Sequence, residues 1–263
     1  MSEATRRPVG TDETVAANRA WWDAEAPAYH AEHGTFLGDD GFVWGPEGWT
    51  EEELDLVGVR DGMTVLEIGA GAGQCSRWLA GRYDVRVVAS DLSGGMLRTG
   101  RGIDADRPAP LPLLQCDGTR LPLADASVDR VFTAYGVVPF VADSAAVLQE
   151  AARVLRPGGR FVFSTSHPVR WAFPDVPGPE GLTATHSYFD RTPYVESEAG
   201  VVTYVEHHRT LGDLVRQVVA AGLTLLDLVE PEWPERNAAE WGGWSPLRGR
   251  LLPGTAIVVT ERR

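Results

Sequence analysis

The stretch that decides the fold is Thr64–Gln74, with the sequence TVLEIGAGAGQ. A short apolar run, typical of a buried strand, leads into glycines at positions 69, 71 and 73, and a helix is predicted near 74–81. Glycines allow the backbone to turn sharply and to approach a ligand closely at the N-terminus of the following helix. The stretch therefore predicts a strand, a ligand-binding turn and a helix in succession.

Short apolar strands and helices continue to alternate after this loop. After the strand at 64–69, we predict strands at 85–90, 113–116, 128–134, 160–166, 223–229 and 256–260. We predict helices at 94–103, 144–155 and 211–221, and the second of these stops at Arg156-Pro157-Gly158-Gly159. This alternation favours a parallel sheet that is covered by helices on both faces.

Two segments depart from the alternation. The first, 13–56, combines a helix at 13–34, which Pro27 would break or restart, with an aromatic-rich loop and a short helix at 51–56. The second, 167–207, is rich in proline, glycine and aromatic residues and contains a predicted hairpin at 188–205. We expect a disordered tail at 1–12, an N-terminal helical cap at 13–56, and a core at 57–263 that carries an insertion at 167–207.

The composition limits the function classes. The 263 residues carry a formal net charge of -13, and the sequence contains no lysine, so a Schiff-base lysine and a P-loop lysine are both excluded. Such an acidic chain is poorly suited to a phosphate backbone, so we expect no nucleic-acid partner. No apolar run reaches the roughly 20 residues of a membrane span. Two cysteines give neither a disulfide framework nor a zinc pattern, so we expect no metal and a cytoplasmic setting.

The spacing of the glycines separates two classes of cofactor. A dinucleotide fingerprint, G-x-G-x-x-G, would place its third glycine at position 74, where this chain has glutamine. The pattern here is E-x-G-x-G-x-G, with Glu67 two residues before Gly69. This pattern resembles motif I of the class I S-adenosylmethionine-dependent methyltransferases, whose loop cradles the aminocarboxypropyl arm and the ribose of the cofactor.

Further landmarks follow in the order that this family shows. Asp91 ends the second strand, and Cys116-Asp117-Gly118 ends the third; the resemblance implies contacts of Asp91 with the ribose and of Asp117 with the adenine amino group. Residues 121–131 look like the family's "LPF…SFD" segment, and 153–159 look like its "LKPGG" turn. The alternation and the resemblance together predict an α/β fold: a Rossmann-like, doubly wound, mostly parallel seven-stranded sheet with helices on both faces, an N-terminal helical cap and a small antiparallel insertion after the fifth strand.

The resemblance implies S-adenosylmethionine as cofactor, and it places residues of four segments around it. We expect cofactor contacts from Tyr29, Glu67, Gly69, Ala70, Gly71, Gln74, Asp91, Leu92, Met96, Cys116, Asp117, Gly118 and Tyr135. Tyr29 belongs to the cap, where the family often places an aromatic residue over the cofactor. Tyr135 follows the fourth strand in a context that lacks the N-P-P-Y motif, which argues against DNA adenine or glutamine methylation.

Methyl transfer is an in-line displacement in which a general base is optional. His167, directly after the fifth strand, is the first candidate for a base, and His33 in the cap is the second. Each has the alternative of a purely structural role. Tryptophans of the cap and the insertion are expected to line an apolar or aromatic acceptor site, unless they only pack the cap on the core: Trp21, Trp22, Trp44 and Trp171.

The leading hypothesis is therefore methyl transfer to a small, apolar or aromatic molecule through an O-, N- or C-nucleophile, as in secondary metabolism. One alternative is an S-adenosylmethionine-binding, non-methylating enzyme or a ligand-binding protein on the same fold. Another is a nicotinamide-dependent oxidoreductase, against which position 74 argues. We expect a small-molecule substrate as partner and no membrane, and a homodimer stays open.

Overall fold

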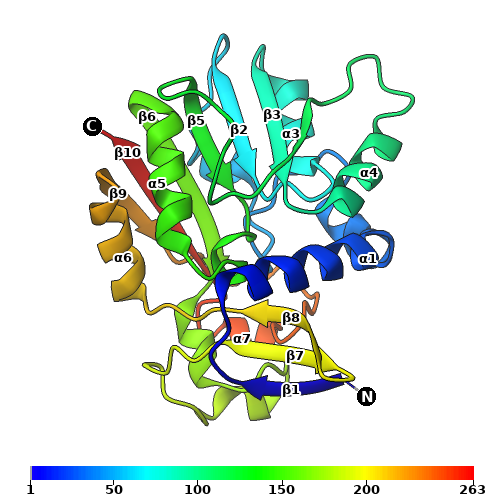
Figure 1. Ribbon diagram of the computed structural model, residues 1–263, viewed down its shortest axis with the longest axis vertical. Coiled ribbons are helices and arrows are strands. Elements are labelled where there is room, and N and C mark those ends of the chain that lie inside the picture. Colours follow the sequence, from blue (N-terminus) through cyan, green and yellow to red (C-terminus); the bar gives the residue numbers. More distant parts are fainter. Residues whose placement is uncertain (1) are drawn as a thin grey trace.

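A seven-stranded sheet forms the centre of the computed structural model, which describes residues 2–263 (Figure 1). Its strand order is β4-β3-β2-β5-β6-β10-β9. The strands are β2 (Thr64–Ile68), β3 (Arg86–Asp91), β4 (Leu113–Gln115), β5 (Val128–Thr133), β6 (Leu155–Ser166), β9 (Leu223–Val229) and β10 (Thr255–Arg262). Neighbours from β4 to β6 pair in parallel, whereas β10 pairs antiparallel with both β6 and β9. The predicted fold class is confirmed.

Helices and short turns connect these strands. The helices are α1 (Thr11–Leu37), α2 (Glu51–Leu54), α3 (Gln74–Arg82), α4 (Gly94–Ile103), α5 (Ser144–Val154), α6 (Leu211–Ala220) and α7 (Pro246–Gly249). Three short 3-10 helices are η1 (Val138–Phe140), η2 (Pro168–Ala172) and η3 (Pro179–Leu182). Within residues 2–263, no helix combines the length and the apolar character needed to cross a membrane.

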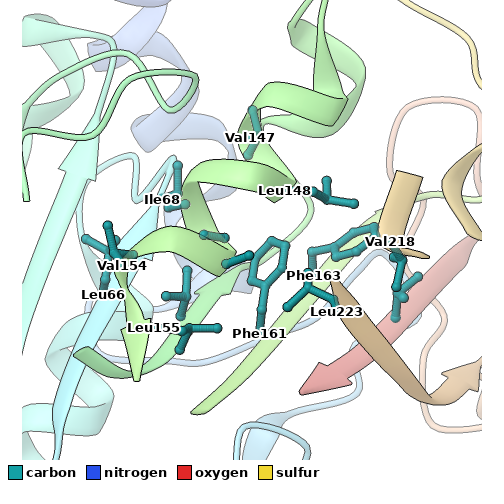
Figure 2. Packing of buried hydrophobic residues seen from close by; sticks show 14 of the residues in the cluster. Leu66, Ile68, Val147, Leu148, Val154, Leu155, Phe161, Phe163, Val218 and Leu223 are labelled. Atoms are coloured by element: carbon teal, nitrogen blue, oxygen red, sulfur yellow. The ribbon is translucent and has the colours of Figure 1, made fainter. Parts of the chain in front are cut away.

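Both faces of the central sheet are buried because side chains alternate along its strands. On one face, Leu66 and Ile68 of β2 and Phe161 and Phe163 of β6 pack against α5 and α6 (Figure 2). On the other face, Val65 of β2 and Val162 of β6 belong to a second cluster with α3 and the aromatic loop before α2. Strands that are apolar on both faces explain why the sequence shows runs of apolar residues.

The strand order places a crevice at the carboxyl ends of β2 and β5. The chain passes from β2 outward to β3 and β4, and then returns to β5 on the opposite side of β2. In open α/β sheets, ligands bind where the strand order reverses in this way. The glycine loop directly follows β2, so it lies at this crevice.

A second, three-stranded antiparallel sheet lies below the central one in Figure 1, in the order β1-β7-β8. It is built from β1 (Ser2–Arg6), β7 (Tyr194–Glu198) and β8 (Val201–Glu206). Its hairpin lies within the predicted insertion. The prediction of a disordered tail at 1–12 is wrong, because Ser2–Arg6 pairs with β7 and α1 begins at Thr11. These first residues show no apolar alternation, so only the partner strand reveals the pairing.

Helix α1 runs between the two sheets without a break (Figure 1). The predicted break at Pro27 is wrong, although proline in a helix interior costs about 3 kcal/mol. Contacts on both sides of Pro27 hold the helix together. Asp23 Oδ1 accepts hydrogen bonds of 2.7 Å from the Ser93 hydroxyl and from the Gly95 N–H, and the Tyr29 ring meets Trp22 at 5.3 Å.

Candidate active site

A cavity of about 530 Å³ lies at the carboxyl ends of the parallel strands. Its size is that of a site for one or two small ligands. One wall comes from the loops after β2, β3, β4 and β5, and the opposite wall comes from α1. The insertion, the loop before α2 and the loop at 241–244 add to the lining. The crevice that the topology predicts is therefore a cavity that several separate parts of the chain line.

The glycine loop has a backbone conformation that requires its glycines. Gly69, Gly71 and Gly73 have φ angles of 70°, 56° and 86°, in the left-handed region that side chains disfavour. A Cβ atom added to Gly71 would meet no protein atom within 4 Å, and Gly71 lines the cavity. The open space beside Gly71 is therefore available to a ligand that contacts the backbone directly.

Asp91 fixes the shape of this loop from the end of β3. Its Oδ2 accepts the Gly71 N–H at 2.8 Å, and its Oδ1 accepts the Ser93 N–H at 2.7 Å. Burial raises the pKa of Asp91 to about 6, and these backbone hydrogen bonds oppose the rise. Each carboxylate oxygen has two lone pairs, so both keep capacity for a ligand donor.

Glu67 lies buried beneath the loop. Its Oε2 accepts hydrogen bonds from the Ser76 N–H at 3.1 Å and from the Ser76 hydroxyl at 2.5 Å. Burial raises the pKa of Glu67 to about 8, while the bonds from Ser76 lower it. The raised pKa favours the protonated carboxyl group, which carries one O–H donor.

The turn after β4 forms the third part of the cofactor side. Asp117 Oδ1 accepts 2.8 Å hydrogen bonds from the Thr119 N–H and from its hydroxyl. A Cβ atom added to Gly118 would lie 2.8 Å from Cγ2 of Ile68, so the close packing of this turn on β2 needs a glycine. Asp117, Cys116 and Gly118 all line the cavity.

Helix α1 supplies an aromatic wall opposite the loops. Tyr29 lies 4.6 Å from His33, and the His33 ring stacks on Trp241 at 4.4 Å with an angle of 16° between the planes. Burial lowers the pKa of His33, against the opposing effect of Glu32, and burial raises the pKa of Tyr29 to about 12. Both rings are therefore neutral near pH 7.

The structure brings most of the predicted site residues together. All of the predicted cofactor residues line the cavity, and so do His33, Trp21 and Trp22. Tyr135 has a φ angle of 59°, a strained conformation for a residue with a side chain, and its hydroxyl lies 3.3 Å from that of Ser166. Tyr135 lines the cavity directly after the end of β5.

Three predicted residues are misplaced. His167 is absent from the cavity lining as far as residues 2–263 are concerned, so the structure favours His33 over His167 as the candidate base. Its Nδ1 accepts the Val169 N–H at 3.1 Å, and its Nε2 lies 2.8 Å from Glu230 Oε1. Trp44 is fully buried and donates to Glu51 at 3.0 Å, and Trp171 packs under Arg170, so neither lines an acceptor site.

Several lining residues were not among the predicted site residues. They come from η1, the end of β6, the insertion and a late loop: Phe140, Ser166, Arg170, Asp175, Tyr204, Glu206 and Trp241. The Pro/Gly/aromatic composition of 167–207 marked the insertion as a candidate functional segment, but it did not single out these side chains.

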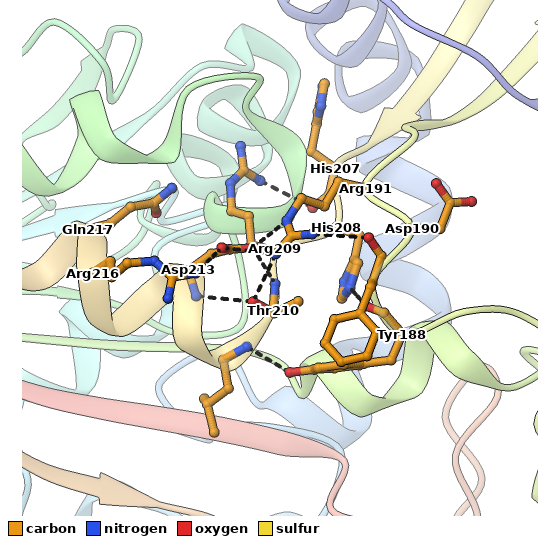
Figure 3. A network of polar contacts seen from close by, with 12 residues as sticks. Tyr188, Asp190, Arg191, His207, His208, Arg209, Thr210, Asp213, Arg216 and Gln217 are labelled. Carbon is orange, nitrogen blue, oxygen red and sulfur yellow. Dashed lines mark hydrogen bonds and ion pairs between the residues drawn. The ribbon is translucent and has the colours of Figure 1, made fainter.

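Arg209 belongs to the network of polar contacts in Figure 3, and its hydrogen bonds also reach the loop after β5. Its guanidinium donates to the carbonyl oxygens of Val138, Val141 and Ala142 at 2.9, 2.6 and 2.9 Å, and to that of His207 at 3.1 Å. Burial lowers the pKa of Arg209 to about 10, so it keeps its charge at neutral pH. Arg209 therefore positions the segment that carries Pro139 and Phe140 along the cavity.

Comparison with known proteins identifies the family of this chain. A family model described as a methyltransferase domain matches residues 66–163. A demethylmenaquinone methyltransferase from Mycobacterium sp. (strain KMS) is 38% identical over 230 residues, which cover 85% of this chain and 83% of that protein. The demethylmenaquinone methyltransferase of Beutenbergia cavernae is 40% identical over 124 residues, 47% of this chain and 49% of that protein. The match thus spans about half the length of the second relative.

A solved structure agrees on the fold. The crystal structure of an S-adenosylmethionine-dependent methyltransferase from Mesorhizobium loti superposes with a TM-score of 0.61 at 24% identity, over 91% of this chain and 98% of that one. The match to the methyltransferase relatives sets aside the nicotinamide-dependent alternative. The chain belongs to the class I S-adenosylmethionine-dependent methyltransferases, and S-adenosylmethionine is its cofactor.

Proposed function

We propose that this enzyme methylates a small apolar or aromatic molecule. The observation that carries the proposal is the aromatic lining next to the cofactor loops, where Trp21, Trp22 and Phe140 come together; the Trp22 and Phe140 rings lie 5.7 Å apart. Aromatic walls bind planar apolar ligands by stacking and edge contacts. The names of the two relatives refer to a demethylated quinone, which supports an aromatic acceptor for this chain as well.

The cofactor is proposed to occupy the side of the cavity near β2, β3 and β4. The open space beside Gly71 accommodates the aminocarboxypropyl arm, and the free lone pairs of Asp91 accept the ribose hydroxyls. Asp117 accepts from the adenine amino group, and Tyr29 covers the bound cofactor from α1. These roles follow the family resemblance, and the lining of the cavity supports them.

The bound cofactor supplies a methyl group on a good leaving group, so no acid is needed. The residues of this chain have to align the acceptor and exclude water. His33 is the proposed base for an acceptor that loses a proton. It lines the cavity, and its lowered pKa keeps it unprotonated and able to accept a proton at pH 7.

The test is product mass. The purified protein is incubated with S-adenosylmethionine and a panel of planar acceptors such as 1,4-dihydroxynaphthalene, with matched aliphatic alcohols and amines as controls. We expect an aromatic product heavier by one methyl group in place of hydrogen, together with S-adenosylhomocysteine. Methylation of aliphatic acceptors alone would contradict the aromatic assignment. An isomerised acceptor of unchanged mass would favour the non-methylating alternative.

A further inference from the structure

Five polar side chains line the cavity on the β6 side: Ser166, Arg170, Asp175, Tyr204 and Glu206. In the strand order, β6 is three positions from β3, which bears Asp91. Adjacent strands are about 4.8 Å apart, so Ser166, the last residue of β6, lies roughly 14 Å along the sheet edge from Asp91, the last residue of β3. The insertion supplies the other four side chains, which we assign with Ser166 to the acceptor end.

Arg170 has no free charge to offer to a ligand. Its Nη2 lies 2.9 Å from Asp175 Oδ2, and its Nη1 lies 3.4 Å from Glu206 Oε2. Its side chain is only 16% exposed, and the buried Arg248 lies 3.7 Å from Asp175 Oδ1, so two arginines balance the charge of the two carboxylates. Although burial acts to lower it, Glu206 and Asp175 raise the pKa of Arg170. A third negative group at this place would leave buried negative charge without compensation.

Glu206 keeps capacity to accept a hydrogen bond. Its Oε1 accepts from the Tyr204 hydroxyl at 2.7 Å, and its Oε2 faces Arg170. A carboxylate has about four lone-pair sites, so two are left. Its side chain is 13% exposed, and it lines the cavity. A hydrogen-bond donor on a ligand therefore finds a carboxylate acceptor here.

The space next to Glu206 has aromatic walls. The Tyr204 ring lies 4.9 Å from that of Trp21 and 5.9 Å from that of Phe140. These three rings come from β8, α1 and η1 and meet at the cavity. Because the rings contact one another, they form one continuous aromatic surface, along which a flat molecule can lie with its edge toward the carboxylate.

We propose that Glu206 selects the methyl acceptor by accepting a hydrogen bond from a ring hydroxyl of a planar aromatic molecule, and that the Arg170–Asp175–Glu206 cluster rejects acceptors that carry a carboxylate. This inference rests on the proposed function, because it assumes that the aromatic end of the cavity holds the acceptor. In this proposal, residues of the insertion determine which polar group the acceptor can carry.

The small sheet provides a matched control. Glu196 lies opposite Tyr204 in the pairing of β7 with β8, as Glu206 lies opposite Tyr194. The Tyr194 hydroxyl donates to Glu196 at 2.8 Å, just as the Tyr204 hydroxyl donates to Glu206. Over the part of the chain that the structure describes, Glu196 does not line the cavity. Glu196→Gln thus repeats the chemical change of Glu206→Gln outside the site.

The experiment measures binding of 2-naphthol, 2-naphthoate and naphthalene to the full chain saturated with S-adenosylhomocysteine, by calorimetry. For the wild type and for Glu196→Gln, we expect 2-naphthol to bind about tenfold or more tightly than 2-naphthoate, as for a hydrogen bond to a charged group. In Glu206→Gln this ratio is expected to fall below about threefold. Glu206→Asp keeps the charge and is expected to retain the rejection of 2-naphthoate.

Three outcomes would overturn the inference. They are preferred binding of 2-naphthoate by the wild type, an unchanged ratio in Glu206→Gln, and an equal loss of the ratio in Glu196→Gln. If 2-naphthol and naphthalene bind but the ratio of the affinities for 2-naphthol and 2-naphthoate is the same in Glu206→Gln as in the wild type, the inference fails and the proposed function stands. If no probe binds, both fail. Unchanged affinity for S-adenosylhomocysteine shows that each variant is folded.

Discussion

The N–H of Gly71 donates to Oδ2 of Asp91 at 2.8 Å, which ties the glycine loop after β2 to the end of β3. Gly71 holds a φ angle of 56° at this contact, and the loop opens onto the cavity. The shape of the cofactor loop is therefore set by a contact between two neighbouring parallel strands. A substitution at Gly71 has two effects, strain in the left-handed backbone and loss of space for a ligand, and a control glycine outside the cavity can distinguish them.

Gly71→Ala is expected to lose at least tenfold in affinity for S-adenosylhomocysteine, because the added methyl occupies the open space that the ligand needs. The left-handed conformation adds about 1–2 kcal/mol of strain. Gly200→Ala is the control: Gly200 has a φ angle of 80° in the turn between β7 and β8, also with nothing within 4 Å of an added Cβ. Calorimetry and urea unfolding should show similar destabilisation of both variants and an affinity loss in Gly71→Ala alone. Equal affinities would contradict the prediction.

Glu67→Gln is expected to stabilise the ligand-free protein at alkaline pH. Burial raises the pKa of Glu67 from 4.5 in the unfolded chain to about 8, so the folded state binds the proton more tightly. The stability that Glu67 contributes is therefore complete below pH 4.5 and is lost as the pH rises through 8. Urea unfolding should show the advantage of Gln over Glu growing by about 2 kcal/mol between pH 6 and pH 8. A pH-independent difference would show that Glu67 does not titrate in this range.

His33→Phe is expected to lower kcat by about 100-fold with an acceptor that must lose a proton, as for loss of a general base. Phenylalanine keeps a flat ring against Trp241, which His33 contacts at 4.4 Å, so cofactor affinity should stay within about twofold. His167→Asn is the matched comparison, because His167 lies outside the cavity lining within residues 2–263. Steady-state kinetics should show nearly normal turnover in His167→Asn. The reverse pattern would restore His167 as the base.

Arg209→Met is expected to reduce the free energy of unfolding by about 3 kcal/mol, because it leaves the carbonyl oxygens of Val138, Val141 and Ala142 without their donor. Arg216→Ala removes an exposed arginine that pairs with Asp213 at 2.6 Å, and it should cost less than about 1 kcal/mol. Urea unfolding of both variants tests the difference. Similar losses would mean that Arg209 acts as an ordinary surface cation.

The cofactor side of the site was predictable because its residues follow directly after strands. Once Asp91 and Asp117 stand at strand ends, a parallel sheet brings them to one edge. The acceptor side was not predictable in this way. Glu206, Phe140 and Trp241 meet only through the folding of the insertion and the late loop onto α1, and no local pattern specifies those contacts.

Among the residues that the structure describes, His167 lies outside the cavity lining for a simple geometric reason. His167 follows the strand that ends at Ser166, and neighbouring side chains of an extended chain point to opposite sides. Ser166 lines the cavity, so His167 turns away toward Glu230. Sequence position identified the correct strand end but not the correct side of it. The tail and Pro27 show the same limit, because long-range contacts decide both.

The unbroken α1 limits how the length of this chain can vary. Asn18 bonds to the carbonyls of Phe140 and Val205, Asp23 bonds to the start of α4, and His33 stacks on Trp241. One residue inserted between Asn18 and His33 would rotate everything after it by about 100°, because an α-helix has 3.6 residues per turn. Homologues that share these three contacts should therefore keep the same number of residues between them. Insertions and deletions should accumulate beyond Asp39 or before Thr11.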